Sequence, residues 1–139
     1  MSLFKKKQID GKALLDKYDN GLLDDYKFLK LFGRVTVYHS TPFGDHKNGG
    51  VKLFALPTQE EDTFYLPVFT TTERASEFFE KAGRKGYLLM EGSFTSCLAT
   101  IKAVNDCDDK PKFGAVLEPG YYGLTFEANA LDTVIRLTL

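Results

Sequence analysis

The stretch Phe64–Glu80 constrains the fold most, because a strand pattern passes directly into a helix pattern there. Apolar side chains point to both faces of the strand around Pro67, so we expect this strand inside a sheet. Proline cannot donate a ladder hydrogen bond, so we also expect a bulge or an unpaired edge at Pro67. Thr70 and Glu73 have the spacing of a capping box. A core-facing helical stripe follows, formed by Ala75, Phe78, Phe79 and Ala82.

The residues before this unit predict helices and strands with short connections. Apolar side chains recur at helical spacing over Leu14–Phe32, and the breaker Asp19-Asn20-Gly21 interrupts them. Either one broken helix or two short helices would satisfy that pattern. β-branched and aromatic residues indicate strands at Val35–Ser40 and Val51–Leu56. Because the connections are short, these strands and the one starting at Phe64 favour an antiparallel meander.

The residues after the unit continue the mixed pattern. Ser93 is expected to cap a second helix, and Asn129 a last short one. Strands are expected at Phe113–Leu117 and Leu124–Glu127, with Pro119-Gly120 placed as in a type II turn. We therefore predict an α+β fold, a mostly antiparallel sheet of about five strands with helices packed against it as a single pair of layers.

Length and composition limit the domain organisation and the classes of partner. The 139 residues suffice for one core, so we predict a single domain over residues 12–139 after a flexible basic N-terminus at residues 1–11. A formal net charge of −1 gives no general attraction for nucleic acid or for an anionic membrane. No apolar run approaches the roughly 20 residues of a membrane span. The two cysteines form no disulfide framework, which is typical of a cytoplasmic protein.

Few residues suggest catalysis or metal binding. Cys97 would be a candidate nucleophile if His39 or His46 met it in space, but its place on an apolar helical stripe is more typical of a small buried side chain. The histidines, Cys107 and the acidic run Asp106–Asp109 lack the spacing of zinc or calcium ligands. A solvated acidic loop is the simpler interpretation of that run. We therefore predict no catalytic residue, no metal and no cofactor.

Aromatic side chains near turns are the best candidates for a protein-binding surface. Tyr121 and Tyr122 follow the Pro-Gly turn, and exposed adjacent tyrosines are common where proteins bind one another. Phe43, in a glycine-rich loop, is a candidate companion, and the acidic residues Asp108 and Asp109 would suit a basic partner. The alternative for the tyrosines is structural, with one covering a sheet edge and the other packed inside.

The run Phe64-Tyr-Leu-Pro-Val-Phe-Thr-Thr-Thr-Glu-Arg-Ala-Ser-Glu-Phe78 resembles the "PVFT" strand and helix cap of the SseB N-terminal-domain family. Those domains continue with a second helix and then a strand that ends in a Pro-Gly turn. Gly114–Gly120 and Leu124–Leu131 match that order, and the resemblance covers about residues 35–136. It implies an α+β domain of bacterial origin and brings no established catalytic residues.

Two functions are compatible with this sequence. We expect a non-catalytic protein-binding module of the bacterial cytoplasm, either an adaptor or an immunity-type partner that covers a toxin. An exposed sheet edge would also permit homo-oligomers. The alternative is a small enzyme or ligand-binding protein whose pocket holds Cys97, His39 or Tyr38. Reactivity of the Cys97 thiol separates the two functions.

Overall fold

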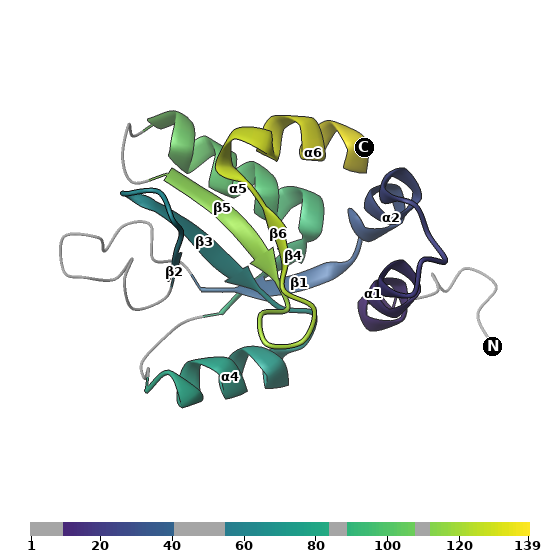
Figure 1. Ribbon diagram of the computed structural model, residues 1–139, viewed down its shortest axis with the longest axis horizontal. Coiled ribbons are helices and arrows are strands. Elements are labelled where there is room, and N and C mark those ends of the chain that lie inside the picture. The colour runs from purple at the N-terminus through teal and green to yellow at the C-terminus, as the bar shows by residue number, and fades with distance from the viewer. Residues whose placement is uncertain (1–9, 41–54, 84–88, 108–111) are drawn as a thin grey trace.

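Two helices open the described chain, strands and helices then follow in mixed order, and the helices surround a central sheet (Figure 1). The computed structural model describes residues 10–40, 55–83, 89–107 and 112–139. Within them the elements are α1 (Gly11–Asp19), α2 (Asp25–Phe32), β1 (Thr36–His39), β2 (Leu56–Pro57), β3 (Thr63–Val68), α4 (Thr72–Lys81), β4 (Met90–Ser93), α5 (Phe94–Cys107), β5 (Lys112–Leu117), β6 (Leu124–Phe126), the 3₁₀-helix η2 (Ala128–Ala130) and α6 (Leu131–Thr138).

The described strands form two sheets rather than one. The larger has the order β2-β3-β5-β6, and the smaller pairs β1 with β4 in antiparallel orientation. The α+β prediction is confirmed, but the single, mostly antiparallel sheet is only partly right, because β3 and β5 run parallel in the centre. A parallel pair needs a long crossover, which α4, β4 and α5 provide. Of the strand predicted at Val51–Leu56, residues 51–54 lie outside the described part of the chain.

The two sheets meet at one isolated bridge. The N–H of Tyr38 donates to the Phe69 carbonyl at 2.7 Å, and the N–H of Phe69 donates to the Tyr38 carbonyl at 2.9 Å. Because backbone groups alternate in direction along a strand, the nitrogen of Pro67 points to the same side as that of Phe69, away from β5. On that side the described part of β2 reaches only as far as Tyr65. In this register residue 54 would face Pro67, and it lies outside the described residues, so the bulge or unpaired edge expected at Pro67 stays a prediction.

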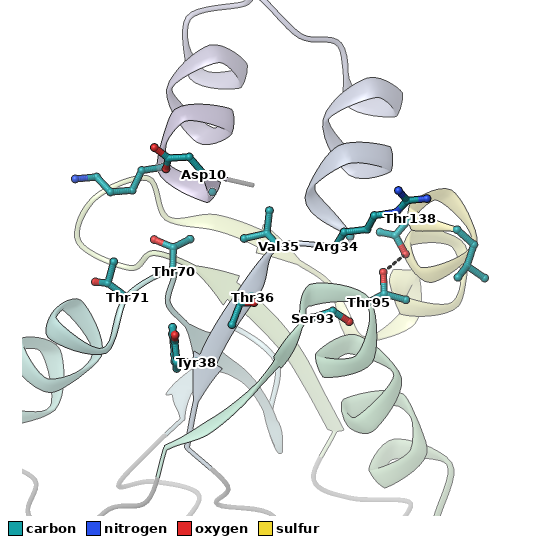
Figure 2. A pocket seen from close by; sticks show the side chains of 14 residues that line it. Asp10, Arg34, Val35, Thr36, Tyr38, Thr70, Thr71, Ser93, Thr95 and Thr138 are labelled. Carbon is teal, nitrogen blue, oxygen red and sulfur yellow. Dashed lines mark hydrogen bonds between the residues drawn. The ribbon is translucent and has the colours of Figure 1, made fainter. Parts of the chain in front are cut away.

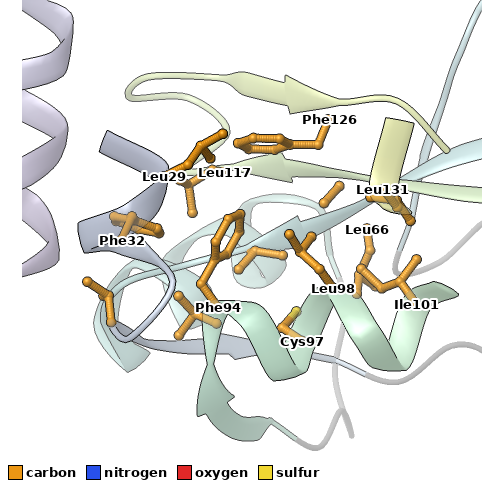
Figure 3. Close-up of a cluster of buried hydrophobic side chains, with 14 of the residues drawn as sticks. Leu29, Phe32, Leu66, Phe94, Cys97, Leu98, Ile101, Leu117, Phe126 and Leu131 are labelled. Atoms are coloured by element: carbon orange, nitrogen blue, oxygen red, sulfur yellow. The ribbon is translucent and has the colours of Figure 1, made fainter. Parts of the chain in front are cut away.

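The core is divided between two faces of β3. Leu66 and Val68 belong to the main cluster, which the sheet shares with α1, α2, α5 and α6 and which Figure 3 shows around Phe94. Phe69, just beyond β3, packs instead with Phe79 in a smaller cluster against α4. Within β3, Leu66 and Val68 on one face and Pro67 on the other are buried, whereas residues 63–65 are half-buried, so the predicted cover on both faces holds for the second half of the strand.

The local signals at the helix ends and at the Pro-Gly turn are largely confirmed. The helical pattern before β1 is two short helices, and Ser93 caps α5. The Tyr121 N–H donates to the Glu118 carbonyl at 3.0 Å with Gly120 at a φ of 89°, as a type II turn requires.

Two predicted caps are wrong. Thr71, not Thr70, caps α4, because the Thr70 hydroxyl donates to the Glu118 carboxylate instead. Asn129 lies inside η2, and no side chain caps the start of α6 at Ala130. A continuous turn of 3₁₀-helix already precedes α6, so its N-terminus has no free position for a cap.

Candidate functional site

A cleft of about 1250 Å³ opens on one face of β1 (Figure 2). Thr36, which is exposed, and Tyr38, which is half-buried, form its floor. The alternate residues Val37 and His39 are buried on the opposite face of the strand. The less buried face of β1 therefore lines the cleft.

The walls of the cleft are helix ends. The N-termini of α1, α4 and α5 and the C-termini of α2 and α6 all reach it (Figure 2). Beside the floor, the lining consists of Asp10, Gly11 and Lys12 of α1, Gly33 and Arg34 after α2, Val35, Thr70 and Thr71 before α4, Ser93 and Thr95 at the start of α5, and Thr138 and Leu139 at the end of α6.

The short polar residues at these N-termini are engaged as caps. Asp10, Thr71 and Ser93 each accept, through a side-chain oxygen, the N–H of the residue three positions later, at 3.2, 3.1 and 3.1 Å. Each cap satisfies one of the N–H groups that a helix start leaves without an intrahelical partner. Side-chain caps therefore fix the first turns of the three helices that begin at the cleft.

Two glycines allow the segments that line the cleft to approach one another closely. A Cβ atom at Gly11 would lie 2.7 Å from Val35 Cγ1, and one at Gly33 would lie 2.7 Å from both Thr138 Cβ and Thr95 Oγ1. Real Cβ atoms essentially never come this close to another heavy atom, so a larger residue would force these segments apart. The closeness of these contacts follows from the tertiary arrangement, because the residues that meet come from distant parts of the chain.

The polar surface of the cleft consists mainly of hydroxyl groups, with two cations. The Thr95 hydroxyl donates to Thr138 Oγ1 at 2.8 Å, which joins α5 to the end of α6. Lys12 and Arg34 are exposed, and neither forms an ion pair with another described residue. The cleft therefore offers hydrogen-bonding groups and positive charge.

The two groups considered for catalysis lie away from the cleft lining. Cys97 is 2% exposed in the main core (Figure 3), and burial raises the pKa of its thiol to about 12. Burial lowers the pKa of His39, although the hydrogen bond between its Nδ1 and the Ser40 carbonyl, at 2.9 Å, opposes that effect. No described contact joins His39 to Cys97, and His46 lies outside the described residues. A neutral, buried thiol is a poor nucleophile.

The residues proposed for protein contact have different surroundings. Tyr121 is 52% exposed, and its ring centre lies 3.9 Å from the guanidinium carbon of Arg74. Tyr122 packs against the main core, and its hydroxyl donates to Asp16, which raises the pKa of the phenol to about 12. Of the pair, Tyr121 is thus the one available at the surface. The other candidates, Phe43, Asp108 and Asp109, lie outside the described residues.

A buried ion pair supports the α4 wall of the cleft. Glu118 is fully buried just after β5, and one carboxylate oxygen lies 2.7 Å from Arg74 Nη1. Its other oxygen accepts the backbone N–H and the hydroxyl of Thr70, which lines the cleft. The sequence analysis missed this pair. The available signal was a carboxylate, Glu118, directly after the apolar run Phe113–Leu117.

The described part of the chain lacks two other kinds of site. It contains no group of three or more His, Cys, Asp or Glu side chains that could hold a metal ion. None of its helices has both the length and the apolar character needed to cross a membrane.

A scan against protein-family models, a search of curated proteins and a search of solved structures found no match to this chain.

Proposed function

We propose that this chain is a non-catalytic protein-binding module of the bacterial cytoplasm, with a fold like that of the SseB N-terminal domains. In this proposal the module, an adaptor or an immunity-type partner, holds a segment of another protein in the cleft on β1. The observation that carries the proposal is the cleft itself, which is open, lined by hydroxyl groups and bordered by an accessible strand.

The size of the cleft favours a polypeptide segment over a small molecule. Its volume of about 1250 Å³ exceeds the roughly 300–1000 Å³ of most small-molecule pockets. Small-molecule pockets are also predominantly apolar, whereas hydroxyl groups line much of this cleft. An extended segment has a polar backbone along its whole length, which suits such a lining.

The backbone of β1 provides a way to bind such a segment. The N–H and C=O of Tyr38 face Phe69, and alternation directs the same groups of Thr36 to that side as well. Beyond Phe69 the chain turns at Thr70 and Thr71 into α4 instead of continuing beside β1. The backbone groups of Thr36 therefore face the cleft, where a bound segment can pair with them as an added strand does.

Blocking the floor of the cleft tests the proposal. The Thr36→Arg variant places a long charged side chain where the segment would lie. Peptides selected from a random display library on the wild-type chain should bind this variant about tenfold or more weakly, a difference of about 1.4 kcal/mol. Fluorescence anisotropy of the labelled peptides measures the affinities.

Ala103→Arg is the matched control, because Ala103 is exposed on α5 and does not line the cleft. It should bind the selected peptides as the wild type does. Equal binding by the Thr36→Arg variant, or a library that yields no specific peptide, would contradict the proposal. Light scattering of each pure variant shows whether it self-associates. A weaker peptide affinity caused by a homo-oligomer that covers the cleft is thereby distinguished from one caused by the substitution.

The alternative function, a small enzyme or ligand-binding protein around Cys97 and His39, makes a different prediction. Tyr38 lines the cleft, but Cys97 and His39 do not, and the raised pKa keeps the Cys97 thiol neutral near pH 7. We expect Cys107, which is exposed, to react with a thiol reagent in the folded protein and Cys97 to stay inert.

The measurement is labelling by Ellman's reagent near neutral pH. The Cys107→Ser variant should show no rapid reaction until guanidinium unfolds it, and then its remaining thiol should react completely. The Cys97→Ser variant should label quickly while folded. Rapid labelling of Cys97 in the folded Cys107→Ser variant would favour the enzyme or ligand-binding function instead.

A further inference from the structure

We infer that the segment bound in the cleft is acidic, with carboxylates that pair with Lys12 and Arg34. This inference rests on the proposed function and names the chemistry of the partner. Both cations line the cleft and are exposed, and neither has an ion-pair partner among the described residues. The remaining charged side chain of the lining, Asp10, accepts the N–H of Ala13 as the cap of α1, and its single negative charge leaves the charged side chains of the lining with a net positive charge.

The distribution of polar groups strengthens the positive character of the cleft. The starts of α1, α4 and α5 reach it, and a helix start carries a partial positive charge. The ends of α2 and α6 carry the opposite sign, but the Lys30 ammonium donates to the Leu139 carbonyl at the α6 end. Together with Lys12 and Arg34, these groups favour an occupant of negative charge.

The positions of the two cations favour an extended occupant over a compact anion. Lys12 lies in the first turn of α1 beside Asp10, and Figure 2 places Asp10 and Arg34 on opposite sides of the β1 floor. A compact anion at one cation would leave the other unpaired. An extended peptide can cross the floor between them and present carboxylates to both cations.

The charge of the whole chain distinguishes an acidic peptide from a nucleic acid. A polyanion that binds through many phosphates requires a broadly basic surface, and the formal net charge here is −1. Two cations in a hydroxyl-lined cleft match a few carboxylates at fixed positions instead. We therefore assign the site to an acidic protein segment and treat a nucleic acid as an outcome of the test.

Charge reversal tests the inference. The wild-type chain should select display peptides rich in Asp and Glu, and their affinity should fall as the NaCl concentration rises. The double variant Lys12→Glu and Arg34→Glu should bind those peptides about tenfold or more weakly and should select Lys-rich and Arg-rich peptides instead. The matched control, Lys17→Glu with Lys27→Glu, reverses exposed charges on α1 and α2 outside the cleft lining and should keep the acidic selection.

The outcomes separate this inference from the proposed function. Selected peptides that are neutral or basic, yet bind the Thr36→Arg variant weakly, would overturn the inference and leave the proposed function intact. If every selected peptide binds the Thr36→Arg variant as tightly as the wild type, both the inference and the proposed function are overturned. An oligothymidine that displaces the acidic peptides and binds more tightly than they do would overturn the inference in favour of a nucleic-acid partner.

Discussion

The Arg74→Ala variant is expected to lose about 3–5 kcal/mol of the free energy of unfolding, because it leaves a buried carboxylate without its cation. Arg74 Nη1 lies 2.7 Å from a carboxylate oxygen of Glu118, whose side chain has no exposed surface. The backbone N–H and hydroxyl of Thr70 hold the other oxygen, so the carboxylate has no direct route to solvent. The arginine also stacks over Tyr121, and that contact would be lost as well.

Equilibrium denaturation by urea measures this loss, with the slope of the transition as a check that the folded state is unchanged. Arg136→Ala is the matched control, since Arg136 pairs with Asp132 at 3.3 Å between side chains that are 69% and 63% exposed. That variant should lose at most about 1 kcal/mol. Replacing both Arg74 and Glu118 by apolar residues should recover much of the loss. An Arg74→Ala variant as stable as the Arg136→Ala control would show that this ion pair contributes little.

The Phe94→Ala variant is expected to lose about 3–5 kcal/mol as well, because it opens a cavity in the main core. Phe94 is fully buried at the first position of α5. Its ring centre lies 5.0 Å from that of Phe32 and 5.3 Å from that of Phe126, both at edge-to-face angles (Figure 3). One side chain therefore joins α2, α5 and β6, and its removal weakens all three contacts.

The same denaturation measurement applies to this variant, and Phe64→Ala is its control. Phe64 is half-buried on β3 and makes a longer ring contact, 6.2 Å, with Phe113. Its truncation removes less buried area and should cost clearly less. Equal losses in the two variants would mean that the core around Phe94 collapses to fill the space.

Local elements of this fold were predictable from neighbouring residues. The alternation around Pro67 indicated a strand covered on both faces, and Ser93 and Pro119-Gly120 marked a helix start and a turn. Each signal depends on residues a few positions apart, so these contacts form largely independently of the tertiary packing. The cap of α4 was misplaced by one residue because three consecutive threonines precede or begin that helix, and a distant carboxylate, Glu118, binds Thr70.

The pairing of the strands was less predictable. The short connections favoured neighbours in sequence, yet β1 pairs with β4 and β3 pairs with β5 in parallel. Alternation shows which face of a strand is buried, but it is the same for parallel and antiparallel neighbours. The choice among partners depends on how α4 and α5 cover the sheet, which no local pattern contains.

Hydrophobic periodicity and capping act within a few residues, so the residues alone predicted the helical segments and the strands β1, β3, β5 and β6, but not β4. The cleft on β1 and the Arg74–Glu118 pair behind its α4 wall arise from the tertiary arrangement. The cleft gathers residues from Asp10 to Leu139, and the ion pair joins positions 74 and 118. Such sites form only when packing brings distant segments together, so their chemistry depends on the arrangement of elements rather than on any one of them.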